Sequence, residues 1–148
     1  MADSDAFISL AKRHATARGL LPHVVCAICE RESSWDPWAI RYEPDFQRRY
    51  VTPLGLDATA SVARSISWGL MQVMGQSARE VGYAGPLPAL CDPANGLEWG
   101  CRLFAEKLKH AEGNYQQALN LWNGGDNPAY APEVLAIAEQ YRQRFLTG

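Results

Sequence analysis

Long hydrophobic runs are missing from this sequence of 148 residues. There is no stretch of about 18 apolar residues, so we expect no membrane-spanning helix. The first six residues read Met-Ala-Asp-Ser-Asp-Ala, and this acidic start lacks the basic region and apolar core of a secretion signal. We therefore expect synthesis in the cytoplasm without a recognisable signal peptide.

An excess of charge of one sign is also missing. Lys and Arg total 14 against 16 Asp and Glu, which gives a formal net charge of −2. A weakly acidic chain without a run of about five like charges offers no electrostatic surface for nucleic acid. Nucleic acid is therefore not an expected partner.

Cysteine is sparse, and its spacing matches no common metal site. Cys26 and Cys29 form one close pair, whereas Cys91 and Cys101 lie far downstream and well apart. We expect no metal and no cofactor. Because Cys26 and Cys29 fall on a predicted helix beside apolar residues, we interpret the four cysteines as reduced core thiols.

Helical periodicity is what the sequence has in abundance. Composition, with 47% hydrophobic and 20% charged residues, suits one packed domain over residues 1–148. Apolar spacing and capping signals predict a first helix that ends near residue 19 and a second helix that begins at residue 22. They also predict one helix from 93 to near 113, one over about 115–122 and one over about 128–145. Residues 41–68 break the pattern and predict a loop-rich excursion, and no alternation indicates a strand. The predicted fold class is all-α, with a single domain.

Glu32 stands where a helical stripe should place another hydrophobic residue. The stripe has steps of three and four residues and consists of Leu21, Val24, Val25 and Ile28. Glu32 lies about 40° from Ile28 around the helix axis, whereas Glu30 lies roughly 200° away and is expected to face solvent. A carboxylate on a buried stripe is costly unless it has a use.

The residues after Glu32 suggest that use. Pro37 ends the helix, so Glu32 falls in its last turn, where the negative end of the macrodipole disfavours an anion. Trp35 can exclude water from the same place, and both effects raise a carboxyl pKa. The pattern is typical of a general acid. The alternative is a structural glutamate that caps the helix or pairs with Arg31 or Arg41.

Four short blocks in this chain carry a family resemblance. Residues 32–37, Glu-Ser-Ser-Trp-Asp-Pro, resemble the Glu-Ser-x-aromatic-x-Pro signature of the soluble lytic transglycosylase (SLT) family, which is goose-lysozyme-like. Residues 67–73 resemble its Gly-Leu-Met-Gln block, residues 118–125 its Ala-Leu-x-x-Tyr-Asn-x-Gly block, and residues 130–135 the block that begins with a tyrosine facing the catalytic glutamate. Each block is weak alone, but four in order over about residues 20–142 are strong together.

This resemblance implies a lysozyme-like helical domain and a role for each matching residue. It implies that Glu32 is the catalytic acid and base, assisted by Tyr130. It also implies substrate-binding residues, which are Ser33, Ser65, Ser67, Met71, Gln72, Trp122 and Asn123. Two departures stand out: Trp122 replaces a tyrosine and loses its hydroxyl, and the longer link before Gly69 makes the match of Ser65 and Ser67 loose.

The implied activity is cleavage of the β-1,4 bond between N-acetylmuramic acid and N-acetylglucosamine in peptidoglycan, with a 1,6-anhydro product. The expected partner is the bacterial glycan strand, the expected state a monomer, and the expected place of action the periplasmic or external cell wall. A phage lysis enzyme, a virion component and a bacterial protein all fit.

Two alternatives remain open. A goose-type muramidase would use water and a second carboxylate from the excursion, for which Glu43, Asp45 and Asp57 are candidates. A catalytically silent wall-binding module would keep the fold without the activity.

Overall fold

The structure is a computed structural model that describes residues 2–148, with side chains from residue 4 onward. Helices make up 69% of it, which confirms the predicted helical class. The α-helices are α1 (Ala2–Ala17), α2 (Pro22–Ser33), α3 (Pro44–Phe46), α4 (Ala58–Arg64), α5 (Gly75–Glu80), α6 (Pro93–His110), α7 (Tyr115–Asn123) and α8 (Tyr130–Thr147). Short π- and 3₁₀-helical turns are η1 (Gln47–Val51), η2 (Thr52–Leu54) and η3 (Leu87–Cys91). None of the helices in the described part is long and apolar enough to cross a membrane.

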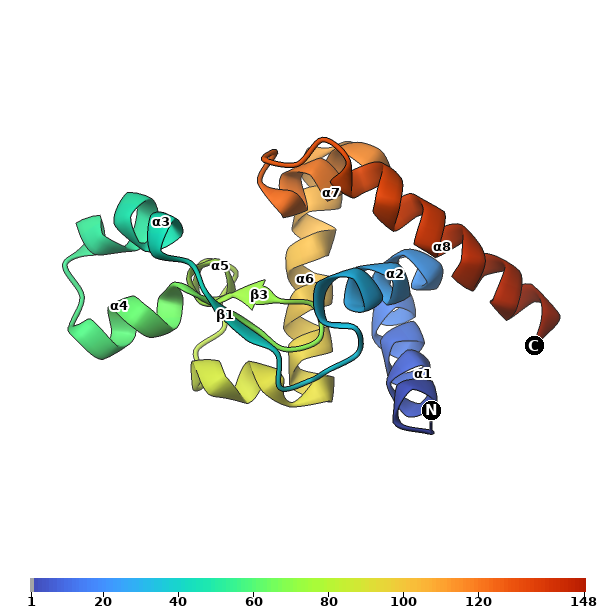
Figure 1. Ribbon diagram of the computed structural model, residues 1–148, viewed down its shortest axis with the longest axis horizontal. Coiled ribbons are helices and arrows are strands. Elements are labelled where there is room, and N and C mark those ends of the chain that lie inside the picture. Colours follow the sequence, from blue (N-terminus) through green and yellow to red (C-terminus); the bar gives the residue numbers. More distant parts are fainter. Residues whose placement is uncertain (1) are drawn as a thin grey trace.

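Helix α2 lies at the centre of the helical body, where it packs against α1 and α8 (Figure 1). Pro22 occupies its first turn, as predicted. All residues from Val24 to Cys29 are buried, so this part of the helix meets protein on every side. The last turn, which carries Glu32, therefore has neighbours on more than one face.

The four cysteines, all within the described residues, are buried and none forms a disulfide. This confirms the interpretation as reduced core thiols. Burial raises the pKa of Cys26 and of Cys101 to about 12. Since the thiolate is the reactive form, these side chains are inert near neutral pH.

Helix α6 runs along the back of the body and starts where the sequence predicts. The Asp92 side chain accepts a hydrogen bond from the backbone N–H of Asn95 at 3.0 Å, and Pro93 occupies the first turn. Gly100 lies on its buried face, and a Cβ there would collide with the sulfur of Met71. The loop that carries Met71 therefore packs directly on this helix.

Residues 41–68 are more ordered than the predicted loop-rich excursion. They form β1 (Ile40–Tyr42), α3, η1, η2, α4 and β2 (Ile66–Trp68), which lie to one side of the helical body (Figure 1). Each element is at most seven residues long. Such short elements show no periodicity in the sequence, which explains why the prediction missed them.

The strands β1, β2 and β3 (Val73–Met74) form a small antiparallel sheet in that order. Ile40 pairs with Trp68, and Arg41 pairs with Ser67. Because neighbouring residues of a strand point to opposite faces, Ile40 and Trp68 share one face and Arg41 and Ser67 share the other.

Candidate active site

Glu32 and Tyr130 meet where the end of α2 contacts the start of α8. The Tyr130 hydroxyl donates a hydrogen bond of 2.6 Å to Oε2 of Glu32. Tyr130 is only 2% exposed. The two residues stand 98 positions apart in the chain, and the fold brings them into direct contact.

The environment of Glu32 favours its protonated form. Burial raises its pKa, and four neighbours oppose the rise by favouring the charged carboxylate. These are, from the largest effect, the Tyr130 hydroxyl, Arg31, the Trp122 indole and Arg41. Burial outweighs them, so Glu32 keeps its proton to a higher pH than an exposed glutamate does. A general acid needs this property.

Tyr130 stays a hydrogen-bond donor at any ordinary pH. Its pKa is raised well above the usual value for tyrosine by burial first, and then by the charge of Glu32 and the hydrogen bond to it. The phenol therefore holds one oxygen of the Glu32 carboxyl group through this hydrogen bond.

Arg31 links the two helices that carry this pair. Its guanidinium carbon lies 5.4 Å from the centre of the Tyr130 ring, within cation–π range. Its Nε donates to Oε2 of Glu133, in the first turn of α8, at 3.2 Å. From the sequence, Arg31 was expected only as a partner of Glu32, although its place beside Glu32 in the last helical turn marks it as a site neighbour.

The turn after Glu32 has a rare backbone conformation. Ser34 has φ 51° and Trp35 has φ 64°, both in the left-handed region that non-glycine residues seldom adopt. The Trp35 side chain is buried, and its indole N–H donates to the Tyr141 hydroxyl at 2.9 Å. These contacts fix the turn, and strain of this kind persists only where the surroundings hold it.

Glu30 is only partly exposed and has a hydrogen-bond partner, contrary to the expectation that it faces solvent. Its Oε1 accepts a hydrogen bond of 2.6 Å from the Tyr141 hydroxyl. The side of α2 opposite Ile28 is covered by α8, which carries Tyr141. Tyr141 follows Tyr130, Val134 and Ala138 at helical spacing, so the buried stripe of α8 could have revealed it.

Ser33 ties the end of α2 to the loop after β2. Its Oγ lies 2.9 Å from the carbonyl oxygen of Cys29 and 2.8 Å from that of Leu70. The one hydroxyl proton is shared between these two backbone acceptors. Ser33 thus positions the loop, and contact with substrate stays a prediction.

Gln72 lies in that loop with φ 52°, and its side chain is held by the backbone. Its Nε2 donates to the carbonyl oxygens of Ala39 and Gly69, at 2.9 and 3.0 Å. The side-chain oxygen accepts no hydrogen bond from the described residues, so it is the atom with which Gln72 could contact a sugar. Gly69 has φ 75°, and a Cβ there would collide with the carbonyl of Leu90.

Two predicted substrate contacts are not supported by the structure. The Met71 side chain is 0% exposed and packs on Gly100, so it is a core residue and only its backbone could reach a ligand. Ser65 is also 0% exposed, and its hydroxyl donates to the Ser61 carbonyl at 2.8 Å. Ser67 is buried on the face of the sheet that it shares with Arg41.

Trp122 and Asn123 end α7 near the glutamate. Trp122 packs edge-on against Phe104, with ring centres 5.6 Å apart, and its indole acts on the charge of Glu32. Asn123 donates to the Asn127 carbonyl at 3.4 Å, which leaves its side-chain oxygen available.

The three candidate second carboxylates have other partners. Glu43 pairs with Arg41 at 3.1 Å, and Asp45 pairs with Arg48 at 3.0 Å. Asp57 caps α4 by accepting the Ala60 N–H at 2.8 Å. Among the described side chains, which begin at residue 4, no group of three His, Cys, Asp or Glu is arranged to hold a metal ion.

Comparison with known proteins identified a family. The model of the family described as "Transglycosylase SLT domain" matches residues 9–139. No curated protein and no solved structure matched the chain. Since the family match covers most of the 148 residues and includes both Glu32 and Tyr130, the chain belongs to the transglycosylase SLT domain family.

Proposed function

We propose that this protein is a lytic transglycosylase that cleaves the β-1,4 bond between N-acetylmuramic acid and N-acetylglucosamine and forms a 1,6-anhydro end. Membership of the SLT family implies a peptidoglycan enzyme that cleaves glycosidic bonds. The observation that carries the finer proposal is that Glu32, a partly buried carboxyl group, has a raised pKa and accepts a hydrogen bond from Tyr130.

In the first half of the reaction, Glu32 acts as an acid. It gives its proton to the glycosidic oxygen, and the bond from this oxygen to the anomeric carbon of N-acetylmuramic acid breaks. The 2-acetamido group of the same sugar stabilises the positive charge that develops at that carbon. Tyr130 keeps the Glu32 carboxyl group oriented through its hydrogen bond.

In the second half, the ionised Glu32 acts as a base. It takes the proton from the O6 hydroxyl of the muramyl sugar while O6 attacks the anomeric carbon. Glu32 regains its proton, and no water enters the product. Gln72 and Asn123 each have a side-chain amide oxygen with which they would orient the sugar.

The muramidase alternative needs a second carboxylate that activates water across the sugar. The local partners of Glu43, Asp45 and Asp57 favour the transglycosylase. Since the substrate is the cell wall, we further propose that the protein acts in the periplasm or outside the cell.

Mass spectrometry of muropeptides released from purified cell walls tests the reaction. Transglycosylase products should be about 18 mass units lighter than muramidase products, the mass of the water not added, and should lack a reducible muramyl end. Glu32→Gln should lose at least about a hundredfold in rate. Glu106→Gln, which changes an exposed glutamate on α6, should keep the rate.

The loop acids provide the opposing test. Glu43→Gln, Asp45→Asn and Asp57→Asn should each leave turnover within roughly threefold, well below the effect of losing a general base. Asparagine can still cap α4 at position 57. Reducing-end products together with a large loss in one of these variants would identify a hydrolase instead. A folded wild-type protein that releases no muropeptides would identify the silent module.

A further inference from the structure

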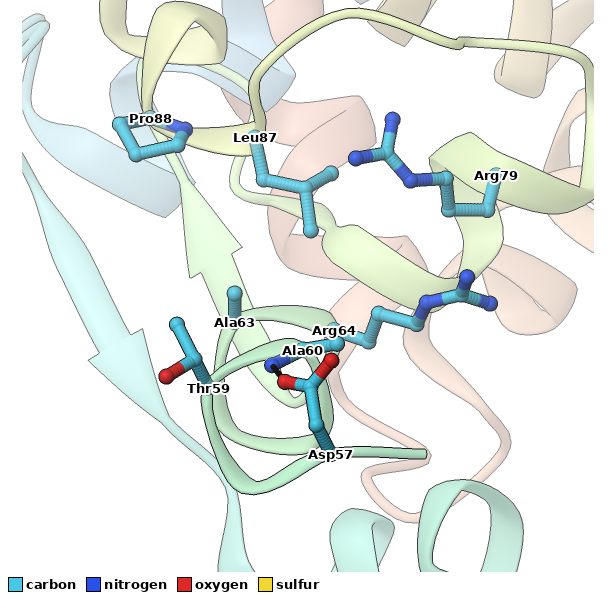
Figure 2. A pocket seen from close by; sticks show the side chains of 8 residues that line it. All are labelled: Asp57, Thr59, Ala60, Ala63, Arg64, Arg79, Leu87 and Pro88. Atoms are coloured by element: carbon cyan, nitrogen blue, oxygen red, sulfur yellow. Dashed lines mark hydrogen bonds between the residues drawn. The ribbon is translucent and has the colours of Figure 1, made fainter. Parts of the chain in front are cut away.

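A cavity of about 440 Å³ lies between α4, α5 and η3 (Figure 2). Apolar atoms of two alanines, a leucine and a proline form much of its wall, together with polar and charged side chains. The lining residues are Asp57, Thr59, Ala60, Ala63, Arg64, Arg79, Leu87 and Pro88. Neither Glu32 nor any other residue of the candidate active site lines it.

The cavity lies apart from Glu32. None of its eight lining residues hydrogen-bonds to Glu32 or is among the groups that act on the pKa of that carboxyl group. The cavity adjoins the sheet instead, because the Trp68 indole N–H donates to the carbonyl of Ala63, which lines the cavity, at 3.2 Å. A ligand in the cavity would therefore not occupy the place of the bond that Glu32 is proposed to cleave.

Two arginines of this cavity have neutral partners only. Nη1 of Arg79 donates to the carbonyl oxygens of Tyr83 and Gly85, at 2.8 and 2.6 Å. Nη1 of Arg64 donates to the Gln76 side-chain oxygen at 3.2 Å. Among the side chains of residues 4–148, neither arginine has an ion-pair partner, in contrast to Arg31 and Arg41.

The fixed guanidinium groups can receive an anion. Figure 2 shows both arginine side chains along the same side of the cavity, away from Thr59 and Pro88. Asp57 is turned toward the first turn of α4, where it accepts the Ala60 N–H. Guanidinium groups that are already held in place lose little freedom on binding a carboxylate, and their planar N–H groups match its two oxygens.

We propose that this cavity binds the terminal carboxylate of a peptidoglycan stem peptide, with Arg64 and Arg79 as the carboxylate-binding residues. The identity of the peptide rests on the proposed function, because stem peptides are the carboxylate-bearing part of that substrate. The small apolar side chains Ala60, Ala63 and Leu87 suit the methyl groups of terminal alanines. Thr59 lies on the opposite side, where its hydroxyl can accept a peptide N–H.

Binding of acetyl-D-alanyl-D-alanine, followed by NMR of the backbone amides, tests the proposal. The dipeptide should shift resonances of α4 and η3, and its C-terminal amide, which lacks the charge, should bind at least about fivefold more weakly. Arg64→Gln should weaken binding of the acid by a similar factor, whereas Arg64→Lys should keep part of it. Arg13→Gln is the matched control, because Arg13 is an exposed arginine on α1 beside another, shallow hollow.

Equal affinities for the acid and the amide would overturn the proposal, as would no shift up to about 20 mM dipeptide. The proposal would also be overturned if Arg13→Gln weakened binding as much as Arg64→Gln does. Inorganic phosphate is titrated in parallel, and tighter binding of phosphate than of the dipeptide would reject the stem peptide. Because the dipeptide has no glycosidic bond, these results do not depend on whether the protein cleaves glycan. If Arg64→Gln fails to fold, the comparison of acid and amide on the wild-type protein still decides.

Discussion

At the scale of single residues, the state of Glu32 reflects a balance between burial and nearby positive charge. Burial raises its pKa, and Arg31 is one of the groups that lower it. A general acid acts only while it is protonated, so the rate should fall as the pH rises through the pKa of Glu32. Any change that removes a neighbouring positive charge should therefore shift the pH at which the rate decreases.

Arg31→Gln should therefore shift the descending limb of the pH profile of kcat/KM to higher pH. The substitution removes a charge that favours the ionised carboxylate, so Glu32 keeps its proton longer. The measurement is the initial rate on purified cell walls across the pH range. Arg144→Gln is the control, because it breaks another ion pair of α8, with Asp5 at 2.9 Å, away from the site. A limb that stays in place or moves to lower pH in Arg31→Gln would contradict the balance described.

At the scale of elements, the contact between α2 and α8 determines the geometry of the site. Glu30 and Glu32 both accept hydrogen bonds from tyrosines of α8, which are Tyr141 and Tyr130. The Tyr141 hydroxyl also accepts the Trp35 N–H and so reaches the strained turn after Glu32. One hydroxyl group thus connects both helices to that turn.

Tyr141→Phe should lower the free energy of unfolding by about 1–3 kcal/mol, because it leaves the Trp35 N–H and the Glu30 carboxylate without their partner. Urea denaturation measures this loss. Tyr50→Phe removes the same atom from a tyrosine that is 57% exposed, and it should change the free energy by less than about 0.5 kcal/mol. Losses of equal size in the two variants would show that the Tyr141 hydroxyl has no special role.

Long helices were predictable from the sequence, whereas the short elements were not. The starts of α2 and α6 follow from Pro22 and from the Asp92 cap, which are local signals. The strands have two or three residues, too few for an alternating pattern. Glu30 was misplaced because the angle on one helix locates a side chain relative to its own stripe only. The position of α8 decides whether that side is open.

Sequence motifs identified which residues belong to the candidate site, but they did not predict how the side chains are oriented. The contact between Glu32 and Tyr130 agrees with the family resemblance, and the roles of both residues stay predictions. Met71 shows the limit, because membership of a motif does not say which way a side chain points. The Met71 side chain can point into the core because Gly100 has no Cβ, which would otherwise collide with the Met71 sulfur. This contact joins distant parts of the chain. The left-handed conformation of Ser34 and Trp35 has no sequence signal either.

At the scale of the whole molecule, the charge of Glu32 lowers stability near neutral pH. Its pKa is higher in the folded than in the unfolded chain, so the folded protein binds the proton more tightly. The resulting stabilisation is complete below the pKa of an unfolded glutamate. It is lost as the pH rises through the folded-state value.

Glu32→Gln should therefore melt at a higher temperature than the wild type at pH 7.5, by about 3 °C for each kcal/mol gained. The difference should shrink at pH 4.5, because glutamine resembles the protonated acid and can still accept the Tyr130 hydrogen bond. Differential scanning calorimetry at both pH values measures it. Glu106→Gln, at an exposed position, should show no such dependence. A Glu32→Gln protein that melts lower at pH 7.5, or a difference that grows in acid, would rule out this linkage.

The distance in sequence between Glu32 and Tyr130 has a consequence for the order of events during synthesis. Domains form from the N-terminal side as the ribosome extends the chain. Helix α2 and its glutamate emerge early, but Tyr130 opens the last helix and arrives 98 residues later. Until then α2 lacks the cover that α8 gives it, and Glu32 stays solvated and without its donor. We therefore expect the contact between Glu32 and Tyr130 to form only once α8 is complete, and the proposed activity to begin at that point.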